Sequence, residues 1–281
     1  MPTAFAPEQE VVRGKSFDGV RIFYRPGTVD EYVLDEQFNQ YAFLSGVPEY
    51  HPHWGDVIID VGAHIGAFSL LVASKVPLSK VYSIEPSKDN FRLLQINVMA
   101  NQFDNVKIYN LALGERRGMI SLFHNPEGNW GHSIIREFSG KSEIVLMDSL
   151  ENFMGDNDID RCDYLKMNCE GAEFPILLGA PANVLARIKV MLVYYHLDLA
   201  STHSYVELID RLVKCGFVCS IRPENRFRGR IIAVNQFLAE RTGQRIDLPL
   251  NTIRRRLRHL SFLIGRLNRS FLPRLMHFIP S

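Results

Sequence analysis

A glycine-containing loop and a later acidic residue have the types and spacing of a nucleoside-binding site. Residues 60–66 read DVGAHIG and lie between an apolar run and a helical pattern. Glycines let the backbone turn sharply and approach a ligand closely, and the helix that follows offers unpaired N–H groups. Glu85 comes 19 residues after Gly66, at the end of a second apolar run. A carboxylate there can accept hydrogen bonds from both hydroxyls of a ribose, which we favour over a capping or solvated carboxylate.

The spacing of the glycines indicates which kind of nucleoside ligand is expected. Gly62 and Gly66 give GxxxG, whereas dinucleotide-binding loops read GxGxxG, and the chain has no GxxxxGK[ST] phosphate loop. A ligand with a ribose but no phosphates fits better. S-adenosylmethionine is the commonest cofactor of that kind, so the sequence predicts methyl transfer.

Three residues are candidates for a catalytic base, because a hydroxyl that accepts a methyl group also loses a proton. Glu170, Glu173 and His196 all follow apolar runs near the expected carboxyl ends of strands. A base within reach of the hydroxyl would contribute ~10²–10⁴-fold to the rate. The glutamates could instead only favour the start of a helix, and the histidine could be structural. His132 suits a lid or a solvent-exposed loop better than a base.

Short apolar runs alternate with helical patterns, which is typical of a doubly wound, mostly parallel α/β sheet. The expected strands cover residues 57–61, 81–84, 106–109, 164–167, 190–194 and 217–221, and the expected helices cover 67–75, 88–101, 172–178 and 205–215. A last strand, 230–234, follows a short link. That link suggests a hairpin, hence one antiparallel strand at the edge of the sheet.

The domain that carries these patterns is expected at residues 55–238, between two attached segments. In residues 1–54, the turn residues and the apolar spacing predict a hairpin over 11–25, a helix over 30–44 and a loop up to residue 55. The glycine-rich stretch 114–147 predicts a small β insertion, with a mobile loop at 125–133.

The third segment, residues 239–281, is basic. Seven arginines and no acidic residue follow Asp247. The rest of the chain keeps 25 of the 32 basic residues against all 31 acidic ones, so its net charge is about −6. From Ile253 onward, apolar residues recur at helical spacing. Such a helix can lie on an anionic membrane or dock on the acidic body, and both interpretations stay open. Nucleic acid is not expected, because no recognised module surrounds the tail.

The cysteines and the apolar runs restrict the compartment and exclude a metal framework. The four cysteines form no CxxC pair, so reduced core thiols are expected and no metal site is predicted. We see neither a secretory leader nor an apolar run near the ~18 residues of a spanning helix. The protein is therefore expected in the cytoplasm, or at most on a membrane face.

Residues 55–222 resemble the FkbM-type methyltransferases, a branch of the class I S-adenosylmethionine enzymes. Five blocks carry the resemblance in the family's order: DVGAHIG (60–66), Glu85-Pro86, NLALG (110–114), MDSL (147–150) and LKMNCEGAE (165–173). The resemblance implies a seven-stranded sheet whose last strand is antiparallel. It also implies cofactor-site residues: Asp60, Gly62 and Gly66 at the methionine end, Glu85 at the ribose, Leu111 and Ala112 beside the adenine, and Asn168 near the sulfonium. His64 and Pro86 are expected to bind the cofactor as well.

The chain departs from the family's pattern at three positions. His64 stands where the family usually has Asn, Asn168 where it has Asp, and Tyr195 precedes His196 where it has Glu. The loss of a negative charge at Asn168 is expected to weaken binding of a cationic cofactor.

The resemblance implies O-methylation of a sugar, polysaccharide or related polyhydroxylated metabolite, with a small molecule or glycan as partner. The alternative is a catalytically inactive cofactor- or ligand-binding protein that keeps the fold.

Overall fold

The computed structural model describes residues 12–40, 43–44, 46–76, 78–138 and 140–241. Within these ranges, no helix has both the length and the apolar character needed to cross a bilayer. The same ranges hold no cluster of three or more His, Cys, Asp or Glu side chains suited to a metal ion. All four cysteines are free thiols, and Cys162 and Cys219 are buried. The predicted tail helix beyond residue 252 lies outside the described residues.

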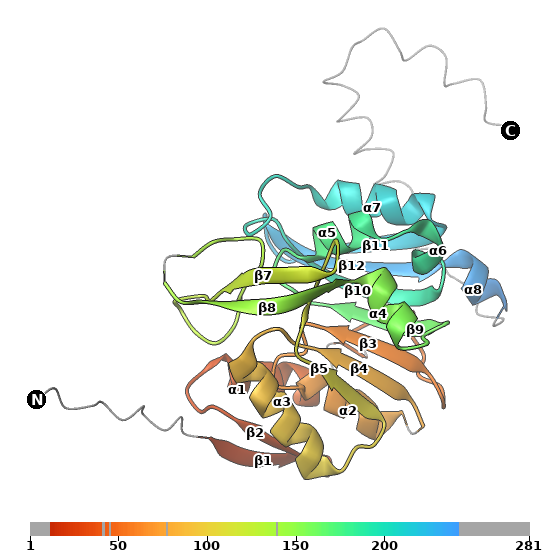
Figure 1. Cartoon of the computed structure of the whole chain (residues 1–281). Helices are drawn as coiled ribbons and strands as arrows, with labels where there is room; N and C mark the ends of the chain where they lie inside the picture. Colours follow the sequence, from red (N-terminus) through yellow and green to blue (C-terminus); the bar gives the residue numbers. More distant parts are fainter. Residues whose placement is uncertain (1–11, 41–42, 45, 77, 139, 242–281) are drawn as a thin grey trace, which may run out of the picture. The chain divides into compact units, whose positions relative to one another are not determined.

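A seven-stranded sheet forms the centre of the fold (Figure 1). Its strands are, in chain order, β3 (Val57–Val61), β4 (Lys80–Ile84), β5 (Val106–Tyr109), β9 (Cys162–Met167), β10 (Ile188–His196), β11 (Phe217–Pro223) and β12 (Arg228–Asn235). Their order in space is β11-β12-β10-β9-β3-β4-β5. β12 pairs antiparallel with both of its neighbours, β10 and β11, and the remaining pairs of the sheet are parallel. The predicted class is confirmed, but the antiparallel strand was wrongly placed at the edge, because β12 inserts between β10 and β11.

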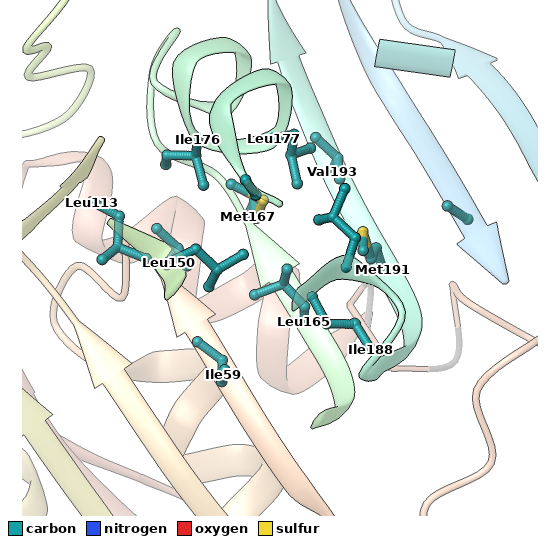
Figure 2. Close-up of a cluster of buried hydrophobic side chains, with 14 of the residues drawn as sticks. Ile59, Leu113, Leu150, Leu165, Met167, Ile176, Leu177, Ile188, Met191 and Val193 are labelled. Atoms are coloured by element: carbon teal, nitrogen blue, oxygen red, sulfur yellow. The ribbon is translucent and has the colours of Figure 1, made fainter. Parts of the chain in front are cut away.

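Helices cover both faces of this sheet. Helices α2 (Ala67–Lys75) and α3 (Lys88–Asn101) pack on one face, and α5 (Glu173–Gly179) and α7 (Tyr205–Lys214) on the other. On the α5 side, alternate strand residues such as Ile59, Leu165 and Met191 form one apolar core (Figure 2). The short helices α4 (Leu150–Asp156) and α6 (Ala182–Leu185) and the terminal α8 (Gln236–Arg241) were not predicted.

The N-terminal segment packs against the outer side of α2 and α3. A hairpin, β1 (Arg13–Phe17) and β2 (Val20–Tyr24), precedes α1 (Val29–Leu34) and a π-helical turn, η1 (Asp35–Asn39). The predicted hairpin is therefore confirmed, but the predicted helix to Leu44 ends five residues early. The apolar spacing suggested a longer helix because Phe43 is buried, but Phe43 lies in a turn. Its ring lies 5.9 Å from that of Phe68.

The predicted insertion is a three-stranded sheet of its own, made of β6 (Ala112–Gly114), β7 (Gly118–Phe123) and β8 (Ser142–Ser149), in the order β6-β8-β7. The loop predicted to be mobile, 125–133, returns to β7, since Phe123 and Ser133 exchange backbone hydrogen bonds of 2.9 and 3.0 Å. Its Asn129 side chain also donates to Asp30 over 2.6 Å. The loop is thus tied to the N-terminal segment.

Candidate cofactor and active site

The carboxyl ends of three neighbouring strands bring the predicted motifs together. Val61 pairs with Ile84 on one side and with Met167 on the other. The next residue of each strand, Gly62, Glu85 and Asn168, therefore leaves the sheet at one place. Ligands of open α/β sheets bind at this edge, outside the carboxyl ends of the strands.

Gly62 allows the loop after β3 to approach the end of β9. Its φ is +76°, and a Cβ atom there would lie 2.0 Å from the carbonyl oxygen of Asn168. Lys166 holds this loop in place, because its Nζ donates one hydrogen bond to Asp60 and one to the Gly62 carbonyl oxygen, both over 2.8 Å. Asp60 also accepts from Ser69. The backbone turn is thus held by a buried ion pair rather than by the ligand.

Glu85 turns its carboxylate toward this loop. Its Oε2 accepts from the backbone N–H of His64 over 2.8 Å, and its Oε1 accepts from that of Ser87 over 3.0 Å. Each oxygen keeps acceptor capacity for a further donor. Burial raises the pKa of Glu85 to about 7, against the opposing effect of these hydrogen bonds. The geometry suits a carboxylate that receives two ligand hydroxyls.

His64 connects the loop to two remote segments. Its backbone is left-handed, with φ +55°, and its Nε2 lies 3.3 Å from Asp30 Oδ1 and 3.2 Å from the Asn129 carbonyl oxygen. Asp30 is also ion-paired with Arg25. Burial lowers the pKa of His64 to about 4, so the ring is neutral. The imidazole therefore works here as a hydrogen-bonding link between the loop, α1 and the insertion.

A cavity of about 950 Å³, including its open part, lies over these strand ends. An apolar side continues from β5 into the insertion. The residues of that side are Leu111, Ala112, Leu113 and Leu122. Pro86 also lines the cavity, and Asn110 holds the Glu85 and Pro86 carbonyl oxygens by two hydrogen bonds. An apolar wall of this kind is what the predicted adenine contact of Leu111 and Ala112 requires.

Buried polar atoms without a partner also point to a ligand. Asn168 Oδ1, His64 Nδ1, Gln37 Oε1 and Glu170 Oε2 are buried and make no hydrogen bond with the described residues. All four residues line the cavity. Such atoms are rare in folded proteins and each calls for a reason. A polar molecule with its own donors, such as S-adenosylmethionine, supplies that reason, so the residues present fit the expected cofactor.

The three candidate bases form one cluster at the ends of β9 and β10. His196 Nδ1 lies 3.2 Å from Glu173 Oε1, and its Nε2 lies 3.5 Å from Glu170 Oε2. Burial alone would lower the pKa of His196, but the two carboxylates raise it to about 9. The ring is therefore protonated at neutral pH. Of the three, only Glu170 lines the cavity, whereas Glu173 is fully buried.

The structure brings most of the predicted residues to the cavity wall and places others behind it. Gly62, His64, Glu85, Pro86, Leu111, Ala112, Asn168 and Glu170 line the cavity. Asp60, Gly66, Glu173 and His196 do not. Asp60 accepts a hydrogen bond from Lys166 Nζ, and Glu173 accepts one from the backbone N–H of His196 over 2.7 Å. These residues shape the wall rather than face the ligand.

Sequence reasoning missed several lining residues. Lys166 lies within LKMNCEGAE (165–173) but is not among the predicted cofactor contacts. Glu36, Gln37 and Phe43 belong to residues 1–54, which are predicted to form a separate extension. The polar pair Glu36-Gln37 beside an apolar stripe carries no motif that would have revealed it. Tyr195, one of the departures, does not line the cavity, since its ring packs 5.2 Å from that of Tyr205.

The chain is similar in sequence to known proteins. The family model of the methyltransferase FkbM domain matches residues 60–219. Methyltransferase sdnD from Sordaria araneosa is 26% identical, over 53% of this chain and 68% of that protein. The AMB antimetabolite synthetase AmbE from Pseudomonas aeruginosa is also 26% identical, over 68% of this chain but only 11% of the synthetase.

A solved structure, an S-adenosylmethionine-dependent methyltransferase from Aquifex aeolicus, aligns with 75% of this chain and 99% of its own, at a TM-score of 0.43 and 12% identity. The family model spans more than half of the chain and includes the glycine loop, Glu85 and the Glu170 region. The chain therefore belongs to the FkbM family of S-adenosylmethionine-dependent methyltransferases.

Proposed function

We propose that the protein transfers the methyl group to a hydroxyl of a sugar-like, polyhydroxylated acceptor, with Glu170 as the base. The observation that carries this proposal is the position of Glu170. Its carboxylate lines the cofactor cavity, and its Oε2 is buried without a hydrogen bond to the described residues. A carboxylate oxygen that lines the cofactor cavity and accepts no hydrogen bond from the described part of the chain, although it lies 3.5 Å from His196 Nε2, is suited to receive the proton of a hydroxyl.

A second hollow adjoins the cavity and suits the acceptor. It measures about 830 Å³, including open solvent, and shares Trp130 and Gly131 with the first. Arg228 lines this second hollow and also lies near the proposed base. The Arg228 Nη2 pairs with Asp198 over 2.7 Å, and the Arg228 Nη1 lies 3.9 Å from Glu170 Oε2. An indole ring beside charged donors and acceptors matches a ring that bears many hydroxyls.

The chain's own residues would supply positioning and proton transfer. When bound, the cofactor supplies an electrophilic methyl group on a sulfonium. Glu170 accepts the hydroxyl proton, while the His196 imidazolium, held by Glu173, keeps the carboxylate oriented and ionised. Alignment of acceptor and donor is worth up to ~7–11 kcal/mol of barrier lowering, and the base ~10²–10⁴-fold.

The test measures transfer of a radiolabelled methyl group from S-adenosylmethionine to soluble saccharides and polyols. Glu170→Gln should transfer label about 100-fold more slowly than the parent, while its affinity for S-adenosylhomocysteine stays within about twofold, because the change removes the base and keeps the shape. Glu151→Gln, an exposed change on α4 outside both hollows, is the matched control and should transfer normally. Normal transfer by Glu170→Gln would remove it as the base.

The alternative, an inactive binding protein that keeps the fold, draws on Asn168, which replaces a family carboxylate in the cavity. It predicts that the parent binds S-adenosylhomocysteine and labels no saccharide or polyol. That outcome would reject the sugar-like acceptor.

A further inference from the structure

The end of the cavity away from the apolar side is built by the N-terminal segment. Leu111 follows β5, Glu85 follows β4 and Gly62 follows β3, so the wall advances across the sheet in the order β5, β4, β3. The lining also includes Glu36 and Gln37, both in the π-helical turn η1. Glu36 interacts electrostatically with Lys166 of β9 and Arg230 of β12, two strands on the side of β3 opposite β4 and β5. Turns of this kind are rare and often mark functional sites.

Both of these side chains present acceptors to the cavity. Gln37 is fully buried, and its Oε1 makes no hydrogen bond with any residue in the described ranges. Its amide nitrogen donates to Glu36 Oε2 over 3.2 Å, which directs the amide oxygen elsewhere. Burial raises the pKa of Glu36. A buried amide oxygen that accepts no hydrogen bond from the described residues therefore lies beside a half-buried carboxylate that accepts one from the Gln37 amide nitrogen. An unsatisfied buried acceptor is costly.

The nearby cations are engaged with other partners. Lys166 and Arg230 both act on Glu36 electrostatically. Lys166 Nζ, however, donates to Asp60 and to the Gly62 carbonyl oxygen, and Arg230 Nε lies 3.1 Å from Glu224 Oε1. Among the described residues, neither cation forms an ion pair with Glu36. The position is thus suited to a cation brought by the ligand.

We propose that Glu36 and Gln37 bind the α-ammonium group of the amino-acid part of S-adenosylmethionine. An ammonium group carries three donors and one positive charge, which matches one carboxylate and one amide oxygen. The order of groups in the cofactor, adenine, ribose and then amino acid, follows the order of Leu111, Glu85 and Glu36 along the wall. The proposal rests on cofactor binding and not on the identity of the acceptor.

Calorimetry with two ligands separates this contact from the rest of the site. S-adenosylhomocysteine carries the ammonium group, whereas 5′-methylthioadenosine keeps adenine and ribose but lacks the amino acid. Glu36→Gln should weaken S-adenosylhomocysteine about 10- to 100-fold, the scale of a lost charge-assisted hydrogen bond. It should leave 5′-methylthioadenosine within about twofold. Gln37→Leu should act in the same direction but less strongly, because no charge is lost.

Glu31→Gln is the matched control, since Glu31 is exposed on α1 and does not line the cavity. Thermal melting of each variant shows that it is folded. Unchanged binding of S-adenosylhomocysteine by Glu36→Gln would overturn the proposal, as would equal weakening of both ligands. A parent that binds the two ligands equally would also overturn it, yet leave the cofactor assignment intact. A parent that binds neither would overturn both.

Discussion

The carboxylate of Glu85 holds the loop and faces the cavity at once. Two backbone N–H groups, from His64 and Ser87, fix its orientation before any ligand arrives. Such preorganisation lowers the free-energy cost of ordering groups on binding. Because burial raises its pKa to about 7, its charge changes close to neutral pH.

Cofactor affinity should therefore depend on pH through Glu85. As pH falls from about 8 to about 6, the carboxylate gains a proton and loses acceptor capacity, so binding of S-adenosylhomocysteine should weaken several-fold. Calorimetry at a series of pH values measures this. Glu85→Gln should bind more weakly throughout and lack this step. The same slope in parent and variant would assign the titration to another group.

The cluster around His196 should make the rate of methyl transfer fall at alkaline pH. Its pKa of about 9 lies above the ordinary value of 6.5, so the folded state favours the protonated ring. This stabilisation is fully present below about pH 6.5 and is lost as pH rises through about 9. Single-turnover methyl transfer should fall over the same rise, because the neutral ring no longer supports Glu170.

The control is His196→Asn, which should be slower at neutral pH and should show no loss of rate around pH 9. A parent whose rate is flat across that range would show that the imidazolium is not needed.

Asn168 should tune the preference between cofactor and product. S-adenosylmethionine has a sulfonium charge that S-adenosylhomocysteine lacks. Asn168→Asp restores a negative charge in the cavity, where the Asn168 oxygen is buried without a partner among the described residues. We expect S-adenosylmethionine to gain about fivefold in affinity over S-adenosylhomocysteine, which corresponds to ~1 kcal/mol. Asn168→Ala should not shift the ratio this way, and an unchanged ratio in Asn168→Asp would contradict the prediction.

At the scale of elements, the closeness of β3 and β9 makes Gly62 irreplaceable. A Cβ atom there would meet the Asn168 carbonyl oxygen at 2.0 Å, and at Gly55 it would meet nothing within 4 Å, although both residues have positive φ. Gly62→Ala should therefore lower the melting temperature and abolish cofactor binding. Gly55→Ala should cost only the ~1–2 kcal/mol of a left-handed residue. Similar melting curves for the two variants would contradict the close contact.

The sequence predicted the strands well, because the central ones are short apolar runs buried on both faces. It could not place β12, because a hairpin link allows the strand to lie on either side of its partner. The helix predicted to residue 44 ends at Asn39, since the apolar spacing there reflects burial of Phe43 among aromatic rings rather than helical periodicity. Local pattern indicates burial, and the partner that buries a residue is set by the whole fold.

The same distinction applies to the site. Gly62, Glu85 and Asn168 could be predicted because each directly follows a strand, and parallel strands end at one edge. Glu36 and Gln37 could not, since they reach the cavity through packing of the N-terminal segment on α2. The sequence motifs also do not show that Asp60 and Glu173 lie behind the cavity wall. A motif does not distinguish a residue that contacts the ligand from one that holds the contacting residue in place.

At the scale of the molecule, three segments that lie far apart in the sequence line the cavity. The N-terminal segment contributes Glu36, the sheet contributes the strand ends, and the insertion contributes Trp130. Asp30 joins them, since it pairs with Arg25, contacts His64 and accepts from Asn129. Domain boundaries drawn from sequence at residue 54 therefore cut through a single site.

The basic segment 252–281 lies outside the described residues, and its role stays a prediction from sequence. Its seven arginines, with no acidic residue after Asp247, would each gain ~1 kcal/mol near an anionic bilayer. If the segment lies on membranes, the full chain should float with phosphatidylserine-containing vesicles at low salt and release at high salt. Deletion of 252–281 should abolish flotation, as should Arg→Gln changes at 254–256 and 258 that keep the length. Equal flotation of the full and shortened chains would discard the membrane interpretation and favour docking on the acidic body.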